Sequence, residues 1–346
     1  MEENDKKEGQ SQNSDDRYRM LFHNIPNAFA YCQIIYDDND EPVDFSYLEV
    51  NDAFKKLANY SDQEIVGKKV SEVFSDYRFF QKDIFDIYSQ VASTQQEVSF
   101  EYYFERVDKW LEISVYSPQK GYFVTLIQDV TSSKKSEKKL EDSNKKTKEL
   151  FDQTVDVLAS TIAMRDPFTA GHQKNVAKLA CAIAAEMGLD EDKISGLRIA
   201  ALLHDIGKMA VPSAILNKPH ELTDLELELA RTHAKVGYDI LKKIEFPWPV
   251  AEIVYQHHER LDGSGYPQGL TEDDILLEAK ILAVADVVEA FSFPRSYRPA
   301  QGIEVAIEEI SRNKGWIFDE DVVDACLEII QKKDSNWNSR LIFDQL

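Results

Sequence analysis

Two patterns of hydrophobic and polar residues divide the chain. Up to about Val130, short runs rich in aromatic and β-branched residues alternate with turn residues, which is typical of strands. We expect strands at residues 29–38, 44–50, 97–107, 109–118 and 121–130. With a short helix at 50–61, this order predicts a small α+β domain with an antiparallel sheet over residues 17–131.

The second pattern begins after Asp166, where apolar residues recur at every third or fourth position, as they do in packed helices. No segment of this part of the sequence alternates as a strand would. Residues 150–333 are therefore predicted to form an all-α domain, which makes the chain a multi-domain protein.

A helical linker is expected between the two domains. Residues 132–149 contain no Gly or Pro and consist almost wholly of helix formers, and the helix should continue into the second domain. A weak heptad runs through it. Its positions are Leu140, Thr147, Phe151, Thr154 and Leu158. The segment is thus either a solvated single helix or a parallel two-stranded coil that joins two copies of the chain into a homodimer.

Charge and cysteine usage exclude several classes of protein. With 40 Lys and Arg against 62 Asp and Glu, the net charge is −22, which disfavours binding to bulk nucleic acid and to anionic membranes. The three cysteines are far apart, so neither a disulfide framework nor a zinc ribbon is expected. Residues 1–16 are polar and predicted to be disordered, residues 334–346 form a tail without an assigned role, and no long apolar run is present. A cytoplasmic location is expected.

Five of the seven histidines lie in polar motifs of the helical domain, together with two aspartates. These residues are His172, His204, Asp205, His233, His257, His258 and Asp286. Imidazole and carboxylate ligands together suit transition metals rather than calcium. Seven ligand groups are too many for one tetrahedral site, and they suit two divalent metals with Asp205 able to bridge them.

A two-metal site lowers the pKa of bound water and holds a phosphoryl group for attack. Lys208 follows Asp205 by three residues, so its ammonium group is a candidate catalytic partner that stabilises phosphate charge. The glycines of LDGSGYP, residues 261–267, allow a tight loop, the GYP loop, directly after the histidine pair.

These motifs resemble the HD-GYP domain, a branch of the HD phosphohydrolases. The matching segments are HDIGK (204–208), HAKVG (233–237), HHERLDGSGYP (257–267), AVAD (283–286) and the opening DPFTAGH (166–172). The resemblance implies an enzyme that hydrolyses cyclic di-GMP to pGpG, with GMP as a further product, and that holds two metals, usually iron or manganese. Some members act on cyclic GMP-AMP instead.

The resemblance also implies a role for each matching residue. His172, His204, Asp205 and Asp286 would hold one metal, and Asp205, His233, His257 and His258 the other. Lys208, Arg295 and Arg298 would bind the phosphates of the substrate. Glu259 and Asp262 would not bind metal themselves but would orient the histidines that do.

The sequence departs from the HD-GYP pattern at four places. Asn175 stands where many members have Arg, Ser296 interrupts the usual R-P-Y, and Glu289 replaces an Asp. Phe168 occupies the position of a third-metal carboxylate, which favours two metals. The departures leave the seven ligand candidates intact and bear on substrate preference and rate.

The first domain resembles a PAS sensor domain. The resemblance rests on NDAFKKL (51–57), IVGK (65–68), WLEISVYSP (110–118) and IQDVT (127–131) in that order. A PAS domain implies regulation of the helical domain, but no cofactor can be named for it, because His23 is expected to be a surface imidazole and Cys32 a buried apolar residue.

Three functions remain open at this point. The first is a phosphodiesterase acting on cyclic di-GMP under PAS control. The second is a catalytically weak receptor or scaffold that binds a cyclic dinucleotide or a protein partner through the PAS domain or the GYP loop. The third keeps the metal chemistry and changes the substrate to cyclic GMP-AMP or another phosphodiester.

Overall fold

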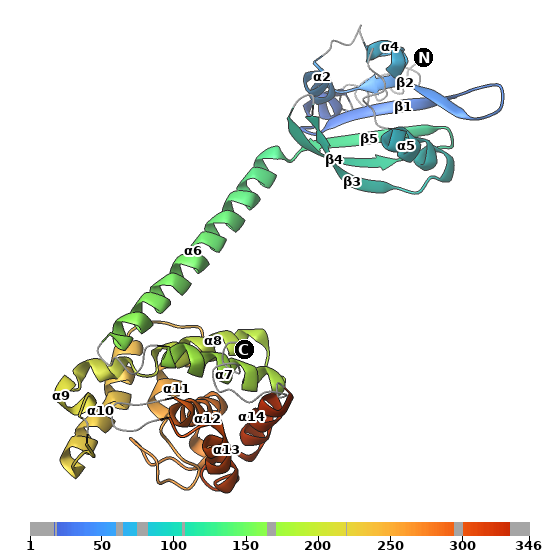
Figure 1. Ribbon diagram of the computed structural model, residues 1–346. Coiled ribbons are helices and arrows are strands. Elements are labelled where there is room, and N and C mark those ends of the chain that lie inside the picture. Colours follow the sequence, from blue (N-terminus) through green and yellow to red (C-terminus); the bar gives the residue numbers. More distant parts are fainter. Residues whose placement is uncertain are drawn as a thin grey trace, which may run out of the picture. The chain divides into compact units, whose positions relative to one another are not determined.

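The computed structural model describes residues 17, 19–59, 65–74, 82–105, 108–164, 171–218, 220–293 and 300–332. The chain divides into two compact units, residues 1–145 and 146–346 (Figure 1). The tails predicted at 1–16 and 334–346 lie outside the described residues.

The first unit contains a five-stranded antiparallel sheet. Its strands are β1 (Ala28–Tyr36), β2 (Pro42–Val50), β3 (Val98–Phe104), β4 (Lys109–Tyr116) and β5 (Tyr122–Asp129). They lie in the order β2-β1-β5-β4-β3, so all five predicted strands are confirmed. Alternate residues of β1 point into the core, and Cys32 is among them, buried as expected.

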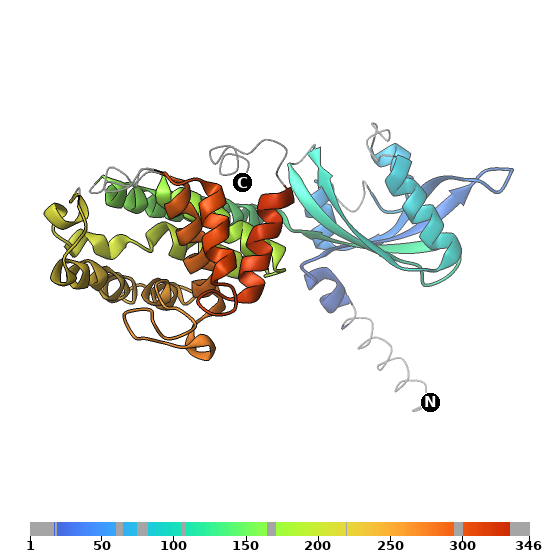
Figure 2. The same ribbon diagram turned by 60° about the horizontal axis from the view of Figure 1, so that its bottom comes forward.

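Short helices pack beside this sheet. They are α2 (Asp52–Ala58), α4 (Val70–Val73) and α5 (Lys82–Thr94), and α5 lies across β4 and β5 (Figures 1 and 2). Aromatic rings fill the space between them: the ring of Phe45 lies 5.2 Å from that of Phe123 and 5.9 Å from that of Tyr88. His23 is exposed, as expected of a surface imidazole, with Nδ1 3.2 Å from Asp52 Oδ1.

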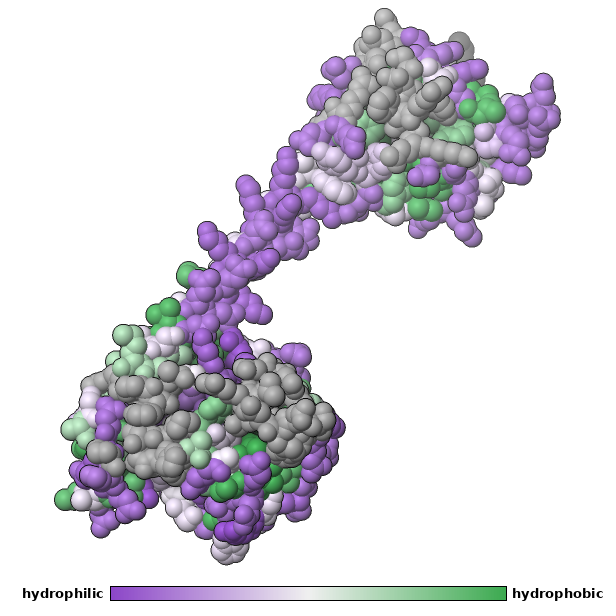
Figure 3. Space-filling model, in the orientation of Figure 1, coloured by the Kyte–Doolittle hydropathy of each residue, from purple (hydrophilic) through white to green (hydrophobic). Residues whose placement is uncertain are grey.

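One long helix, α6 (Thr131–Ala163), contains the predicted linker. Its first turns belong to the sheet unit, where Lys134 Nζ lies 2.7 Å from Glu101 Oε2. Its last turns belong to the helical unit, where Val155, Ala159 and Ile162 are buried. Hydrophilic residues cover most of its exposed length (Figure 3). The predicted continuation of the linker helix into the second domain is confirmed.

The exposed apolar residues of α6 include predicted heptad positions and neighbours of them. Leu140, a predicted position, is 63 % exposed, and Leu150 and Val157 are each 64 % exposed. Phe151, another predicted position, makes a ring contact with Phe246 of the helical unit, at 6.5 Å between centroids. The two-stranded coil stays a prediction.

Apart from two isolated β-bridges, the regular elements of the second unit that the structure describes are all helices, as predicted. Its elements are α7 (His172–Glu186), α8 (Glu191–Leu203), η4 (Ile206–Ala210), α9 (Ser213–Leu216), α10 (Asp224–Leu241), α11 (Val250–Gln256), η5 (Glu272–Asp274), α12 (Leu277–Ser292), α13 (Ile303–Arg312) and α14 (Glu320–Lys332). The central helices α7, α8 and α12 contact one another and carry fully buried residues such as Leu179, Leu197 and Ile281. None of the helices the structure describes has both the length and the apolar character needed to cross a bilayer.

Candidate metal centre

The centre begins where α8 ends. His204 is the C-cap residue of α8, and Asp205 precedes the short helix η4. Both side chains are buried, and His204 Nε2 lies 3.4 Å from Asp205 Oδ2. Adjacent residues within a helix point about 100° apart, so the end of the helix is what lets this pair face one point.

A close approach of two backbones brings His233 to this pair. A Cβ atom on Gly207 would lie 1.9 Å from the carbonyl oxygen of His233, so only glycine allows η4 and α10 to pack at this distance. His233 Nε2 consequently lies 3.8 Å from Asp205 Oδ1. The glycine of the HDIGK segment therefore has a direct structural role in the site.

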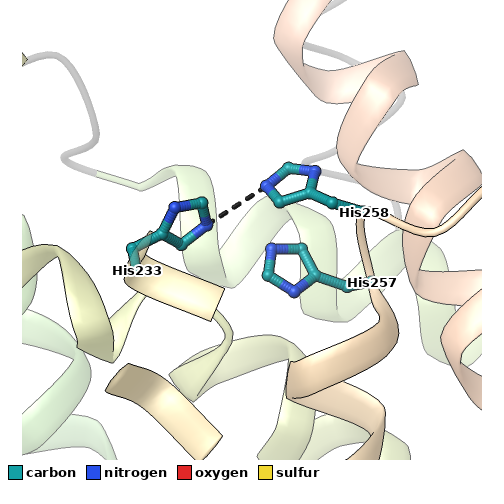
Figure 4. A group of neighbouring side chains, drawn as sticks. All are labelled: His233, His257 and His258. Atoms are coloured by element: carbon teal, nitrogen blue, oxygen red, sulfur yellow. Dashed lines mark hydrogen bonds between the residues drawn. The ribbon is translucent and has the colours of Figure 1, made fainter. Parts of the chain in front are cut away.

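The adjacent histidines at the end of α11 complete this side of the centre (Figure 4). His258 Nε2 lies 3.2 Å from His233 Nε2, and His257 Nε2 is buried without a hydrogen-bond partner. Figure 4 marks this contact as a hydrogen bond, which requires a proton on one of the two nitrogens, whereas a metal about 2.0–2.1 Å from each nitrogen would bind both lone pairs. The donor set therefore fits a metal ion.

His172 from α7 and Asp286 from α12 form the opposite side. His172 Nε2 lies 3.3 Å from Asp286 Oδ1 and 3.7 Å from Asp205 Oδ2. The ligand atoms of all seven residues fall into three groups, each within 4.8 Å, and the third group joins the other two. The groups are His233, His257 and His258; His172, His204 and Asp286; and His204, Asp205 and His257.

Three of the histidines face a backbone carbonyl through Nδ1. The carbonyl belongs in each case to the residue three positions earlier, at 2.6 or 2.7 Å. The pairs are His204 with Ala201, His233 with Ala230, and His257 with Val254. Because a carbonyl can only accept, Nδ1 carries the proton and donates it. Each ring thus has an unprotonated Nε2 for the centre, which is the form of imidazole that binds metals.

Burial and charge keep these groups ready to bind a cation. Burial lowers the pKa values of His204 and His233, and it lowers that of His257 to about 3, so the rings are neutral at pH 7. Burial alone would raise the pKa of Asp205, but the ammonium of Lys208, with Nζ 2.8 Å from Oδ2, helps to hold that pKa well below its usual value.

The GYP loop folds back over the histidine pair. A Cβ atom on Gly265 would lie 2.4 Å from the Cα of Glu259, so glycine is required at this contact. The ring of Tyr266 stacks on that of His258 with centroids 4.6 Å apart, and the guanidinium of Arg231 lies 5.0 Å above Tyr266. The ring of Tyr266 thus lies against the candidate ligand His258, and the cation of Arg231 lies over that ring.

The two predicted supporting carboxylates make contacts within this loop. Glu259 accepts hydrogen bonds from the backbone amides of Gln268 and Leu270, at 2.7 and 3.0 Å. Asp262 accepts from the amide and the hydroxyl of Ser264. These hydrogen bonds hold the loop itself, and the expected orientation of the histidines by Glu259 and Asp262 stays a prediction. Arg295 and Arg298, the expected phosphate ligands, lie outside the described residues.

Sequence reasoning gave no role to Glu289, which contacts His172, or to Asn175, which contacts Glu289. Glu289 Oε2 lies 2.5 Å from His172 Nδ1, and Asn175 donates to Glu289 Oε1 at 3.3 Å. The signal available was a Glu in the otherwise apolar stretch of α12, one turn after Asp286. Arg231, two residues before His233, was not singled out either.

Comparison with known proteins agrees with this architecture. Residues 156–322 match the family model of the HD domain, and residues 32–132 match that of the PAS domain. The chain is 37 % identical over 193 residues to the cyclic di-GMP phosphodiesterase response regulator RpfG of Xanthomonas campestris pv. campestris (strain 8004), covering 55 % of this chain and 51 % of that protein.

Two further relatives cover similar parts of the chain. A cyclic di-GMP phosphodiesterase of Thermotoga maritima is 38 % identical over 179 residues, covering 51 % of this chain and 49 % of the relative. The 3'3'-cGAMP-specific phosphodiesterase 3 of Vibrio cholerae serotype O1 is 38 % identical over 159 residues, covering 46 % and 35 %. The chain thus spans about half the length, or less, of the relatives it matches. The chain thus contains a PAS domain followed by an HD domain, and the HD domain carries the motifs that resemble HD-GYP.

Proposed function

We propose that this chain is a metal-dependent phosphodiesterase that hydrolyses cyclic di-GMP to pGpG, with GMP as the product of a second cleavage. The observation that carries the proposal is the convergence of seven ligand groups, five of them buried and two half-buried, with His233 and His258 facing each other through their Nε2 atoms. The similarity to two proteins named cyclic di-GMP phosphodiesterases supports the choice of substrate.

The proposed ligands divide between two divalent metals. His172, His204, Asp205 and Asp286 would hold one metal, and Asp205, His233, His257 and His258 would hold the other. Mixed imidazole and carboxylate ligands suit iron and manganese, which are the metals we propose. When bound, the metals supply Lewis acidity and lower the pKa of water.

The protein's own groups position the substrate phosphate and balance its charge. Water attacks phosphorus, the bond from phosphorus to the ribose 3'-oxygen breaks, and that oxygen leaves with a proton. Lys208 contacts the phosphate under attack, and Arg295 and Arg298 bind phosphate oxygens, for which a planar guanidinium is suited. Lys208 is one-fifth exposed beside the buried Asp205, so it can reach a ligand from the rim of the site.

The test is turnover by the purified full-length chain after anaerobic loading with Fe(II) or Mn(II). Cyclic di-GMP, pGpG and GMP are separated by chromatography, and the Asp205→Ala variant is assayed in parallel. We expect product that depends on metal and is lost in the variant. An Asp205→Ala variant as active as wild type, or metal-loaded protein without turnover of any cyclic dinucleotide, would overturn the proposal.

A second substrate is favoured by one specific observation, the 38 % identity to a protein named 3'3'-cGAMP-specific. The same assay therefore includes 3'3'-cGAMP at equal concentration. A larger kcat/KM for 3'3'-cGAMP would change the substrate and leave the metal chemistry in place. Tight binding of either dinucleotide without turnover would instead indicate a receptor.

The proposal includes a homodimer that transmits the state of the PAS domain through α6. Leu150 and Val157 are exposed on α6 and lie seven residues apart, which is the spacing a second identical helix would cover in a parallel coil. Sedimentation of the Leu150→Glu, Val157→Glu double variant tests it. We expect a smaller species than wild type, and equal sedimentation would contradict the dimer. The cytoplasmic location, and a protein partner bound through the PAS domain or the GYP loop, stay predictions.

A further inference from the structure

His172 is held differently from the three histidines whose Nδ1 atoms face a backbone carbonyl. It is the first residue of α7 and follows Gly171, whose φ is 100°, so its own helix offers no carbonyl three positions earlier. Its Nδ1 instead contacts a carboxylate from another helix, with Glu289 Oε2 at 2.5 Å. The position of His172 at a helix start thus creates the need for an acceptor from elsewhere.

Glu289 and Asp286 hold the two nitrogens of this one ring. They lie three residues apart on α12, so they share a helix face. Asp286 Oδ1 is 3.3 Å from Nε2, and Glu289 Oε2 is 2.5 Å from Nδ1. The two carboxylates therefore fix both the tilt of the ring and the nitrogen that it presents to the centre.

Glu289 is itself fixed by α7. Its side chain is only 3 % exposed, and a buried carboxylate is stable only when it is hydrogen-bonded. Asn175 lies one turn after His172 and donates to Glu289 Oε1 at 3.3 Å. The two residues that depart from the HD-GYP pattern in this region are thus in direct contact, so each departure is explained by the other.

We infer that Asn175 and Glu289 act as one positioning pair that orients His172 and strengthens the metal position formed by His172, His204 and Asp286. A carboxylate acceptor makes an imidazole a stronger metal ligand than a carbonyl acceptor does. His204 at the same position, and His233 and His257 at the opposite one, face carbonyls, so Glu289 distinguishes the position of His172. The two metal positions are therefore unequal in affinity. This inference rests on the metal site of the proposed function and adds that its two positions differ in metal affinity.

The inference is tested by titrating metal-free, full-length protein with Mn(II) and counting bound metal by electron paramagnetic resonance. Wild type should bind two Mn(II) ions per chain. Glu289→Gln keeps the size of the side chain and removes its charge, and should weaken one position about 10- to 100-fold while leaving the other unchanged. Glu252→Gln, the same change at an exposed position on α11, is the matched control and should titrate as wild type does.

Two further variants separate position from charge. Glu289→Asp keeps the charge but withdraws the carboxylate by one methylene, so it should weaken the same position. Combining it with Asn175→Arg, which supplies a longer and charged partner, should recover part of the loss, and this double variant measures the coupling of the pair. Asn175→Asp, which places a second carboxylate beside Glu289, replaces Glu289→Gln as the test if that variant does not fold. We expect it to weaken Mn(II) binding at the same position.

Several outcomes would overturn the inference. Equal weakening of both positions would indicate a general structural defect, and unchanged titration would show that Glu289 does not support His172. A wild-type chain that binds no Mn(II) would overturn this inference together with the metal centre. Two bound Mn(II) ions with no turnover would overturn the proposed phosphodiesterase activity alone.

Discussion

The two units treat their buried polar groups in opposite ways. In the sheet unit, Asn51 is fully buried, and its Oδ1 accepts from the amides of Phe29 and Phe54 at 3.0 and 2.9 Å. In the helical unit, His257 is equally buried, yet its Nε2 has no partner and adjoins the Nε2 atoms of other ligands. Buried polar atoms normally have hydrogen-bond partners. Asn51 therefore serves the fold, whereas we propose that the histidine cluster serves a metal, at the expense of the stability of the metal-free chain.

The largest effect of this difference should come from acid. The pKa values of His204, His233 and His257 are lowered by burial, that of His257 to about 3, whereas histidines of the unfolded chain titrate near 6.5. Below pH 6.5 the unfolded chain thus binds more protons than the folded one. Metal-free protein should lose about 1.4 kcal/mol per pH unit for each histidine that stays neutral.

Denaturant unfolding of the helical unit at pH 7, 6 and 5, with chelator present, measures this slope. Replacing the exposed His220 by Ala should leave the slope as it is in wild type. A stability that stays constant from pH 7 to pH 5 would contradict the proposed cost of the buried, neutral histidines.

Metal removal should have the next largest effect, and only on the helical unit. A ligand that binds the folded state alone stabilises it by about 4 kcal/mol at a free concentration 1,000 times its Kd. Chelation should therefore lower the unfolding midpoint of the helical unit and leave that of the sheet unit unchanged. Differential scanning calorimetry with and without Mn(II) checks this. Equal shifts of both transitions, or none, would contradict a metal centre confined to the helical unit.

Asn51→Ala is the converse experiment in the sheet unit. It leaves the amides of Phe29 and Phe54 without their acceptor and removes the N-cap of α2. We expect a loss of about 1–3 kcal/mol in the unfolding free energy of that unit, measured by urea denaturation. The number of Mn(II) ions bound should stay at the wild-type value, and a lower number would contradict the separate roles of the two sets of buried groups.

Local patterns explain why so much of the architecture could be predicted. The five strands and the helices follow from side-chain periods of two and of three to four, which neighbouring residues alone determine. The candidate metal ligands stand in short motifs, which can also be recognised from neighbouring residues alone. The contact of Glu289 with His172 joins residues 117 positions apart and needs the packing of α12 against α7. The ring contact of Phe151 with Phe246 likewise joins residues far apart in the sequence.

The smallest predicted effects come from removing either of two cations that lie over aromatic rings. Arg231 lies 5.0 Å from the ring of Tyr266, which stacks on the metal-ligand candidate His258, and Lys134 lies 5.9 Å from the ring of Trp110 in the sheet unit. Such contacts contribute about 0.5–1 kcal/mol when exposed. Arg231→Ala should therefore raise KM severalfold while metal content and melting temperature stay constant, because its guanidinium lies on a ring that stacks on a proposed metal ligand and can attract a substrate phosphate. Lys134→Ala, which also breaks the ion pair with Glu101, should lower only the stability of the sheet unit. If Arg231→Ala instead destabilised the helical unit and left KM unchanged, the cation above Tyr266 would serve the fold, as Asn51 does, and the GYP loop would have no demonstrated contact with the substrate.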